Sequence, residues 1–276
     1  MPDIKIIALD LDGTLLNSQK ELSCENYRTL EAAAAQGIEI VPTTGRFYNA
    51  MPQVIRDLPF VNYAITINGA QIYDKRQDSS IFRAEIPLEQ ALQIMEFMDT
   101  LPVIYDCFMG DASWMTQQLY DQSPDFAPDI HCLKMLLELR NPVPELKAFI
   151  RAQGKDIQKI QFFTKDMELR QRMLVQMPKM FPGNLVSTSL ANNVEINNSR
   201  ANKGEALHIL ARHLGVDPAQ TIAFGDALND LPLVRAAGIG VAMGNAHPIV
   251  KENAAFVTRS CDEDGVAFGI RKFCLT

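Results

Sequence analysis

The stretch IKIIALDLDGT, residues 4–14, decides the fold of this chain. Residues 4–9 form a short apolar run rich in β-branched side chains, which predicts a strand buried in a parallel sheet. Asp10 and Asp12 follow at once, and Gly13-Thr14 then signals a turn. The two carboxylates therefore leave the carboxyl end of a strand, where open α/β sheets bind their ligands.

The spacing of these two acids also predicts chemistry. Carboxylates this close repel each other, so the pair requires a cation or a shared proton. It suits a metal-assisted reaction in which one carboxylate attacks and the other handles a proton. The alternative is an acidic strand-to-turn loop without a function, because Asp and Gly are common turn residues.

Composition limits the class of protein. The 276 residues suffice for one large or two medium domains with a sizeable core. Hydrophobic residues make up 47%, charged residues 21%, and the formal charge is −7, which argues against binding to nucleic acid or an anionic membrane. Five scattered cysteines favour free thiols in a reducing compartment. With no leader sequence and no apolar run of about 18 residues, we expect a cytoplasmic protein.

Strands and helices alternate at both ends of the chain. The pattern predicts helices at 23–36, 47–57, 203–213 and 229–237, and strands at 38–42, 63–67, 221–224 and 239–242. This alternation predicts an α/β fold with a doubly wound, Rossmann-like parallel sheet.

The middle of the chain breaks this alternation. Residues 83–189 mix strands and helices in no regular order, and residues 122–129 are the most loop-like stretch. We therefore predict a core formed by residues 1–82 and 190–276, with residues 83–189 as an inserted α+β cap.

Two further polar positions follow the predicted pattern of the core. Thr44 and Gly45 lie directly after the second core strand, where a hydroxyl and backbone N–H groups can hold an anion. The alternative is a threonine that only caps a helix. Lys203 begins a predicted helix, where the helix dipole disfavours a cation. This position is weak evidence that Lys203 has a function. The alternative is a solvated surface lysine.

The segment GDALND at residues 225–230 is the third polar position. Asp226 and Asp230 offer oxygen ligands that suit a hard divalent ion. The alternative is helix capping by Asn229 or a neighbouring aspartate.

Taken together, these strand ends favour a phosphoryl-transfer site. Carboxylates, a hydroxyl, a fixed cation and an acidic cluster of the magnesium type would meet at one edge of the sheet. The chain has no Gly-x-x-x-x-Gly-Lys-Ser/Thr loop, no Gly-x-Gly-x-x-Gly turn after a strand and no Gly-x-Ser-x-Gly elbow. Nucleotide hydrolysis of the P-loop type, dinucleotide binding and serine-nucleophile hydrolysis are therefore not supported.

The order of these motifs resembles the haloacid-dehalogenase superfamily, and more narrowly its Cof-type sugar-phosphate phosphatases. The motifs that carry the resemblance are Asp10-x-Asp12-Gly-Thr, Thr44-Gly-Arg, Asn68-Gly-Ala, Lys203-Gly, Gly-Asp226-x-x-Asn229-Asp230, Ala242-Met-Gly-Asn-Ala and Asp264-Gly-Val-Ala. The position and size of the predicted insert also resemble the larger α/β cap of that group.

The resemblance implies a role for each matching residue. Asp10 would be the nucleophile that forms an aspartyl-phosphate, and Asp12 would protonate the leaving oxygen and then activate water. Lys203 would neutralise charge on the phosphate and on Asp10. Phosphate-binding residues would be Leu11, Thr44, Gly45, Lys203 and Asn229. Ligands to Mg²⁺ would be Asp10, Asp12 through its backbone carbonyl, Asp226 and, directly or behind the first ligands, Asp230.

The chemistry asks for the same roles. Ionised Asp10 is expected to keep Asp12 protonated near neutral pH, because a nearby negative charge disfavours a second one. We therefore expect a magnesium-dependent phosphatase that acts on a small phosphorylated metabolite, such as a sugar phosphate, as a monomer or small homo-oligomer. The alternatives are a phosphotransferase or phosphomutase, and a non-catalytic protein that binds a phosphorylated metabolite. The cap would exclude water and select the substrate.

Overall fold

The computed structural model describes residues 3–275, which divide into two units. The first unit comprises the chain up to Arg83 and from Asn202 onward, and the second comprises Ala84–Ala201. No helix within the described residues has the length and apolar character of a membrane span.

The first unit is built on a parallel sheet of five strands in the order β14-β13-β12-β1-β2. The strands are β1 (Ile6–Leu9), β2 (Glu39–Pro42), β12 (Thr221–Gly225), β13 (Ile239–Ala242) and β14 (Phe256–Val257). Ile7 and Leu9 of β1 pack into one apolar cluster, and Ile6 and Ala8 into another. Because β1 is buried on both faces, its sequence is a nearly continuous apolar run.

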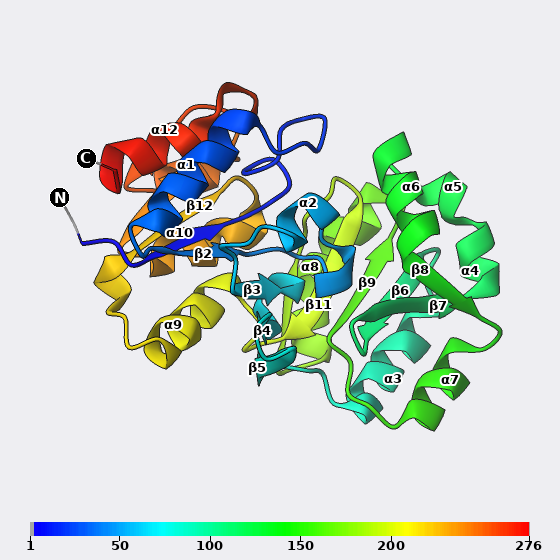
Figure 1. The fold of residues 1–276 in the computed structure, drawn as a ribbon. Coiled ribbons are helices and arrows are strands. Elements are labelled where there is room, and N and C mark those ends of the chain that lie inside the picture. Colours follow the sequence, from blue (N-terminus) through cyan, green and yellow to red (C-terminus); the bar gives the residue numbers. More distant parts are fainter. Residues whose placement is uncertain (1–2, 276) are drawn as a thin grey trace. The chain divides into compact units, whose positions relative to one another are not determined.

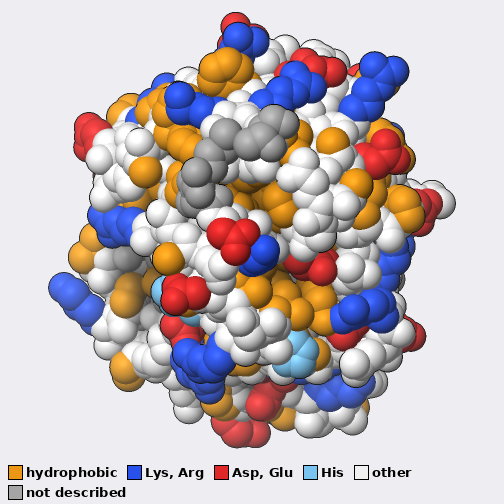
Figure 2. All heavy atoms as spheres, turned by 60° about the vertical axis from the view of Figure 1, so that its left-hand side comes forward, with side chains coloured by type: hydrophobic (Ala, Val, Ile, Leu, Met, Phe, Trp, Pro, Cys, Tyr) orange, Lys and Arg blue, Asp and Glu red, His pale blue; other side chains and the backbone are white. Residues whose placement is uncertain are grey.

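Helices cover both faces of this sheet (Figure 1). They are α1 (Cys24–Ala35) and α12 (Gly265–Phe273) in one cluster, and α9 (Lys203–His213) in the other, with α10 (Leu231–Ala236) and α11 (Pro248–Glu252) beside β12 and β13. The predicted doubly wound α/β fold is therefore confirmed. On the face in Figure 2, acidic and basic side chains are interspersed, with apolar side chains between them.

One predicted strand of this sheet belongs to a different sheet. Residues 63–67 form β3 (Tyr63–Thr66), which pairs antiparallel with β4 (Gln71–Asp74), and β4 pairs with β5 (Ser79–Arg83). The reason is the short turn after β3, because parallel neighbours need a long crossover and a turn of four residues allows only a hairpin. A single bridge from Thr43 to Ile65 links β3 to the end of β2.

The helix predicted at 47–57 is also interrupted. The structure has a 3₁₀ turn at Tyr48–Ala50 and the short helix α2 (Gln53–Arg56). Pro52 lies between them, and proline disrupts a continuous helix by removing a hydrogen-bond donor and clashing with the preceding turn.

The second unit has a six-stranded sheet in the order β10-β11-β9-β6-β7-β8, antiparallel except for the last pair. Its strands are β6 (Ile104–Met109), β7 (Ala112–Thr116), β8 (Arg140–Val143), β9 (Lys159–Phe163), β10 (Asn184–Ser187) and β11 (Asn193–Asn198). Its longer helices are α3 (Leu88–Met98), α6 (Ile130–Leu139), α7 (Leu146–Gln153) and α8 (Met167–Met180).

Two details of this unit differ from the sequence prediction. The loop-like stretch 122–129 contains a short helix, α5 (Ser123–Phe126), which follows α4 (Gln117–Asp121). Strand β11 lies beyond the predicted boundary at 190 but pairs with β9, so the chain rejoins the first unit at Asn202.

Candidate active site

The predicted polar residues meet at the carboxyl edge of the parallel sheet. Leu9 pairs in register with Phe224 on one side and with Pro42 on the other. The residues that follow these three strands therefore emerge side by side: Asp10, the Thr43-Thr44 loop, and the loop that follows Gly225.

Lys203 lies inside this edge and has no exposed surface. Its Nζ donates to Asp10 Oδ1 at 2.6 Å and to Asp230 Oδ1 at 2.5 Å. Burial lowers the pKa of Lys203, but the charges of Asp10 and Asp230 outweigh burial and raise the pKa above its ordinary value. The side chain therefore stays positively charged, and the alternative of a solvated surface lysine is wrong.

Asp230 uses both of its carboxylate oxygens within the protein. Oδ1 accepts from Lys203, while Oδ2 accepts from the backbone N–H groups of Asp226 and Ala227 at 3.0 Å each. Asp230 is fully buried. The capping alternative thus applies to Asp230, which shapes the loop that carries Asp226.

The structure brings three carboxylates into one cluster. Oxygens of Asp10, Asp226 and Asp230 lie within 4.8 Å of one another. Burial raises the pKa of Asp10 well above its ordinary value, and the neighbouring charge of Asp230 adds to this effect. Burial and the charge of Asp230 likewise raise the pKa of Asp226 to about 7. Such a cluster is unfavourable without positive charge, and its oxygen ligands fit Mg²⁺.

Asp226 is held against the first loop of the site. The Thr14 hydroxyl donates to Asp226 Oδ1 at 2.8 Å. Gly13 has a φ of +88°, and a Cβ added there would lie 2.6 Å from Asp226 Oδ2. Glycine is therefore needed at this position, for both its backbone conformation and the approach of Asp226.

Asp12 is not one of the three clustered carboxylates and forms a bidentate ion pair with Arg46. Arg46 Nε donates to Asp12 Oδ2 at 2.8 Å and Arg46 Nη2 to Asp12 Oδ1 at 2.9 Å, while Lys20 lies 3.1 Å from Oδ1. Burial raises the pKa of Asp12, but Arg46 and Lys20 outweigh burial and lower the pKa to about 2. The expectation that Asp10 keeps Asp12 protonated is therefore wrong for this structure, because the nearer guanidinium dominates.

The predicted phosphate-binding residues lie on two neighbouring loops. Thr44 is buried and its Oγ1 accepts from the backbone N–H of Arg46 at 3.2 Å. It caps no helix, because the next helical turn is preceded by Phe47. A Cβ on Gly45 would lie 2.9 Å from Asn68 Oδ1. Leu11 is fully buried and packs its side chain in the core, so any contact with a phosphate would come from its backbone.

Asn68 is a polar residue at this edge for which the sequence predicted no role of its own. Its Oδ1 accepts from Asn229 Nδ2 at 3.1 Å. Ile67, Asn68 and Gly69 all have positive φ, at 54°, 57° and 95°. A β-branched residue rarely adopts this conformation, and such strain is common at functional sites. The Asn-Gly pair in the sequence was a signal for this turn.

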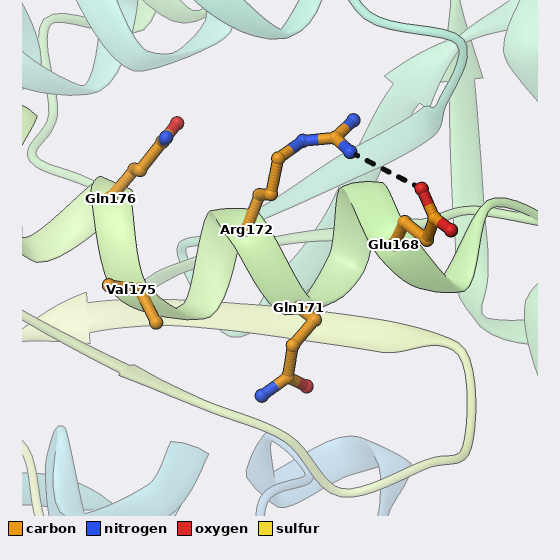
Figure 3. A pocket seen from close by; sticks show the side chains of 5 residues that line it. All are labelled: Glu168, Gln171, Arg172, Val175 and Gln176. Atoms are coloured by element: carbon orange, nitrogen blue, oxygen red, sulfur yellow. Dashed lines mark ion pairs between the residues drawn. The ribbon is translucent and has the colours of Figure 1, made fainter.

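The hollow in Figure 3 lies elsewhere, in the second unit. Its lining residues all come from α8: Glu168, Gln171, Arg172, Val175 and Gln176. The charged pair among them, Glu168 and Arg172, is spaced one helical turn apart at 3.9 Å, as on many solvated helices. None of the predicted site residues lines it.

The comparisons with known proteins cover nearly the whole chain. A family model described as haloacid dehalogenase-like hydrolase matches residues 7–270. Phosphatase YwpJ of Bacillus subtilis (strain 168) is 34% identical over 96% of this chain and 98% of its own length. The 5-amino-6-(5-phospho-D-ribitylamino)uracil phosphatase YcsE of the same organism is 32% identical over 99% and 97%. A solved haloacid dehalogenase-like hydrolase from B. subtilis superposes with a TM-score of 0.84 at 31% identity, over 98% and 99%.

Proposed function

This chain belongs to the haloacid dehalogenase-like hydrolases, as a phosphoric monoester hydrolase of the Cof type, and we propose that it removes phosphate from a small metabolite by way of an aspartyl-phosphate on Asp10, with Mg²⁺ as cofactor. The observation that carries the proposal is the position of Lys203 and the acidic cluster. A fixed cation touches the carboxylate that must meet a dianionic phosphate, and oxygen ligands for a divalent ion lie beside it.

In the first step, an Asp10 carboxylate oxygen attacks phosphorus. The bond from phosphorus to the leaving oxygen breaks and its electron pair stays on that oxygen. Asp12, ionised in the free site, would take up a proton when the negatively charged phosphate binds beside it, and would supply that proton to complete the released alcohol. Lys203 remains protonated and offsets negative charge on Asp10 and on the phosphoryl oxygens. Thr44, the backbone N–H groups of Leu11 and Gly45, and the Asn229 amide hold those oxygens.

In the second step, water attacks the phosphorus of the aspartyl-phosphate. Asp12 takes a proton from that water, the bond between phosphorus and Asp10 breaks, and its electron pair returns to the Asp10 carboxylate. The ion pair with Arg46 matches the ionised form of Asp12 that this step uses.

Mg²⁺ would be held by Asp10, Asp226 and the backbone carbonyl of Asp12, with Asp230 behind them through its bonds to Lys203 and the loop. When bound, the ion supplies positive charge that keeps Asp10 and Asp226 ionised and offsets the charge of the phosphate. The raised pKa values of Asp10 and Asp226 support a cation at this position.

The proposed substrate class is a sugar phosphate or a similar phosphomonoester. The relative YcsE is named for a substrate whose phosphate is carried by a ribityl group, which supports a polyhydroxylated leaving group for this chain. We propose that the second unit, Ala84–Ala201, acts as the cap that selects the substrate and excludes water during turnover.

The test is phosphate release from a panel of sugar phosphates and other phosphomonoesters by the full chain. Activity should disappear after treatment with a chelator and return with added Mg²⁺. Asp10→Asn should lose about 10³-fold or more in kcat, because no nucleophile remains. Asp125→Asn, an exposed carboxylate in the second unit, is the matched control and should keep full activity. Unchanged turnover in Asp10→Asn, or in the presence of the chelator, would refute the mechanism.

A further inference from the structure

We propose that Arg46 is a positioning residue that acts through Asp12: its guanidinium grips both oxygens of that carboxylate and fixes the direction in which it exchanges a proton with the substrate. This inference rests on the proposed function, since it assigns Asp12 to proton transfer. It gives a role to an arginine that the sequence left without one.

The guanidinium group of Arg46 is held by hydrogen-bond acceptors on both sides. Two nitrogens donate to the two oxygens of Asp12, at 2.8 and 2.9 Å. The third, Nη1, donates to the backbone carbonyl of Ala50 at 3.1 Å. The Arg46 backbone N–H also donates to Thr44 Oγ1. The guanidinium is thus tied to the backbone at Ala50, and the Arg46 backbone is tied to the side chain of Thr44.

This geometry favours positioning over direct phosphate binding. Three of the five guanidinium N–H groups already donate within the protein, and the edge formed by Nε and Nη2, which could grip two oxygens of a phosphate, is occupied by Asp12. A bidentate pair fixes the plane of the carboxylate as well as its distance, which a lysine cannot do. Lys20 is the contrast: it makes one contact with Asp12, at 3.1 Å, from a side chain that is 42% exposed.

The orientation of Asp12 matters most when the leaving group is a poor one. An alkoxide leaving a phosphate ester needs a proton as the bond to phosphorus breaks, whereas a nitrophenolate leaves without one. A carboxylate misplaced by about 1 Å can cost about 100-fold in rate. Loss of Arg46 should therefore penalise alkyl phosphates selectively.

The experiment compares Arg46→Ala and Arg46→Lys with the wild-type chain, in Mg²⁺, on an alkyl phosphomonoester and on p-nitrophenyl phosphate. The rate measured is the single-turnover release of the alcohol or nitrophenol, which reports the first step alone, because the second step uses Asp12 on both substrates alike. We expect the single-turnover rate on the alkyl ester to fall about 100-fold in Arg46→Ala, with that on p-nitrophenyl phosphate affected less than about tenfold. Arg46→Lys keeps the charge but loses the fork, so it should show the same selectivity. Asp12→Asn should show the same pattern, and adding Arg46→Ala to it should cost little more.

Arg56→Ala is the matched control. Arg56 lies on the same connection, in α2, and its Nε donates to the backbone carbonyl of Met51 instead of a carboxylate. It should leave the ratio between the two substrates unchanged. Arg46→Lys and millimolar guanidinium added to Arg46→Ala keep the test informative if the alanine variant folds poorly, and guanidinium should restore the alkyl activity selectively.

Three results would overturn the inference. Equal losses of the single-turnover rate on both substrates would indicate a structural role for Arg46, and a raised KM with an unchanged single-turnover rate on both would indicate phosphate binding. An Asp12→Asn variant without leaving-group selectivity would remove the proton-transfer role of Asp12 and this inference with it. The aspartyl-phosphate mechanism would fail separately, through an active Asp10→Asn variant.

Discussion

At the scale of single residues, Lys203 and Asp12 are a contrasting pair. Lys203 is completely buried between two carboxylates, whereas Asp12 is partly exposed and held by Arg46 and Lys20. Burial makes the first arrangement depend on charge balance: the removal of one partner leaves an uncompensated buried charge. The site is therefore coupled to the stability of the fold through Lys203.

Replacing this lysine tests that coupling. In Lys203→Met, Asp10 and Asp230 lose their shared cation, so the free energy of unfolding should fall by about 3–5 kcal/mol in the absence of metal. Urea denaturation with a chelator present measures the change. The double variant Lys203→Met/Asp230→Asn should recover part of the stability and none of the phosphatase activity. A Lys203→Met chain as stable as the wild type would mean that the buried pairs contribute nothing.

The φ of Asn68 allows its backbone and its side chain to be tested separately. Asn68→Gly keeps the left-handed turn but removes the amide that faces Asn229, whereas Asn68→Ala removes the amide and adds strain. Both variants should lose activity by a similar factor, about five- to tenfold. The alanine variant alone should lose about 1 kcal/mol of stability. Full activity in Asn68→Gly would exclude a role for the side chain.

At the scale of elements, local sequence signals explain what could be predicted. The apolar run of β1 and the polar residues after β1, β2 and β12 are adjacent in sequence, so strand ends and their carboxylates were predictable. Pairing between distant residues was not. The partners of Asp12 and Asp230 are Arg46 and Lys203, and only the packing of separate loops decides such pairs.

The assignment of β3 failed for a related reason. Its apolar sequence fits a parallel strand and a hairpin strand equally well. The difference is encoded in the turn at 67–70, whose residues include Asn68 and Gly69. Helix α5 was missed because its four residues include a proline, which reads as a loop signal although proline is favourable in a first helical turn.

The loop that carries Gly13 gives a prediction at this scale. Gly13→Ala should weaken Mg²⁺ activation, because the added methyl group would displace Asp226 from its position beside the loop. The concentration of Mg²⁺ for half-maximal activity should rise by about tenfold or more, comparable to the loss of a residue that orients a metal ligand. Gly37→Ala, also at positive φ but with open space around the Cβ, controls for backbone strain alone. Equal Mg²⁺ dependence in the two variants would contradict the prediction.

At the scale of the whole molecule, the acidic cluster should make stability depend on pH and on metal. The pKa of Asp226 is raised from 3.8 to about 7, so the folded chain without metal holds a proton that the unfolded chain releases between about pH 4 and pH 7. Its free energy of unfolding should therefore fall as pH rises through this window. The pKa of Asp12 is lowered to about 2, so its contribution is present above about pH 4 and is lost as pH falls toward 2.

Thermal unfolding measures this dependence. With a chelator, the melting temperature should decrease from pH 5 to pH 7.5, and Mg²⁺ should restore stability most at the upper end, where protons no longer compete for the carboxylates. Asp226→Asn should flatten the decrease and reduce the effect of Mg²⁺. The same pH slope in wild type and in Asp226→Asn would place the titrating group elsewhere.

The distance along the chain between Asp10 and Lys203 has a consequence for biosynthesis. These residues are 193 positions apart in sequence, and β12, the strand that pairs with one side of β1, follows Lys203. A ribosome therefore finishes Ala84–Ala201, whose sheet is formed entirely from its own residues, before β12, the second partner of β1, has been translated. Until then the nascent chain carries an apolar strand with one open edge, a state in which aggregation competes with folding. The reacting groups are assembled only when the last third of the chain has emerged.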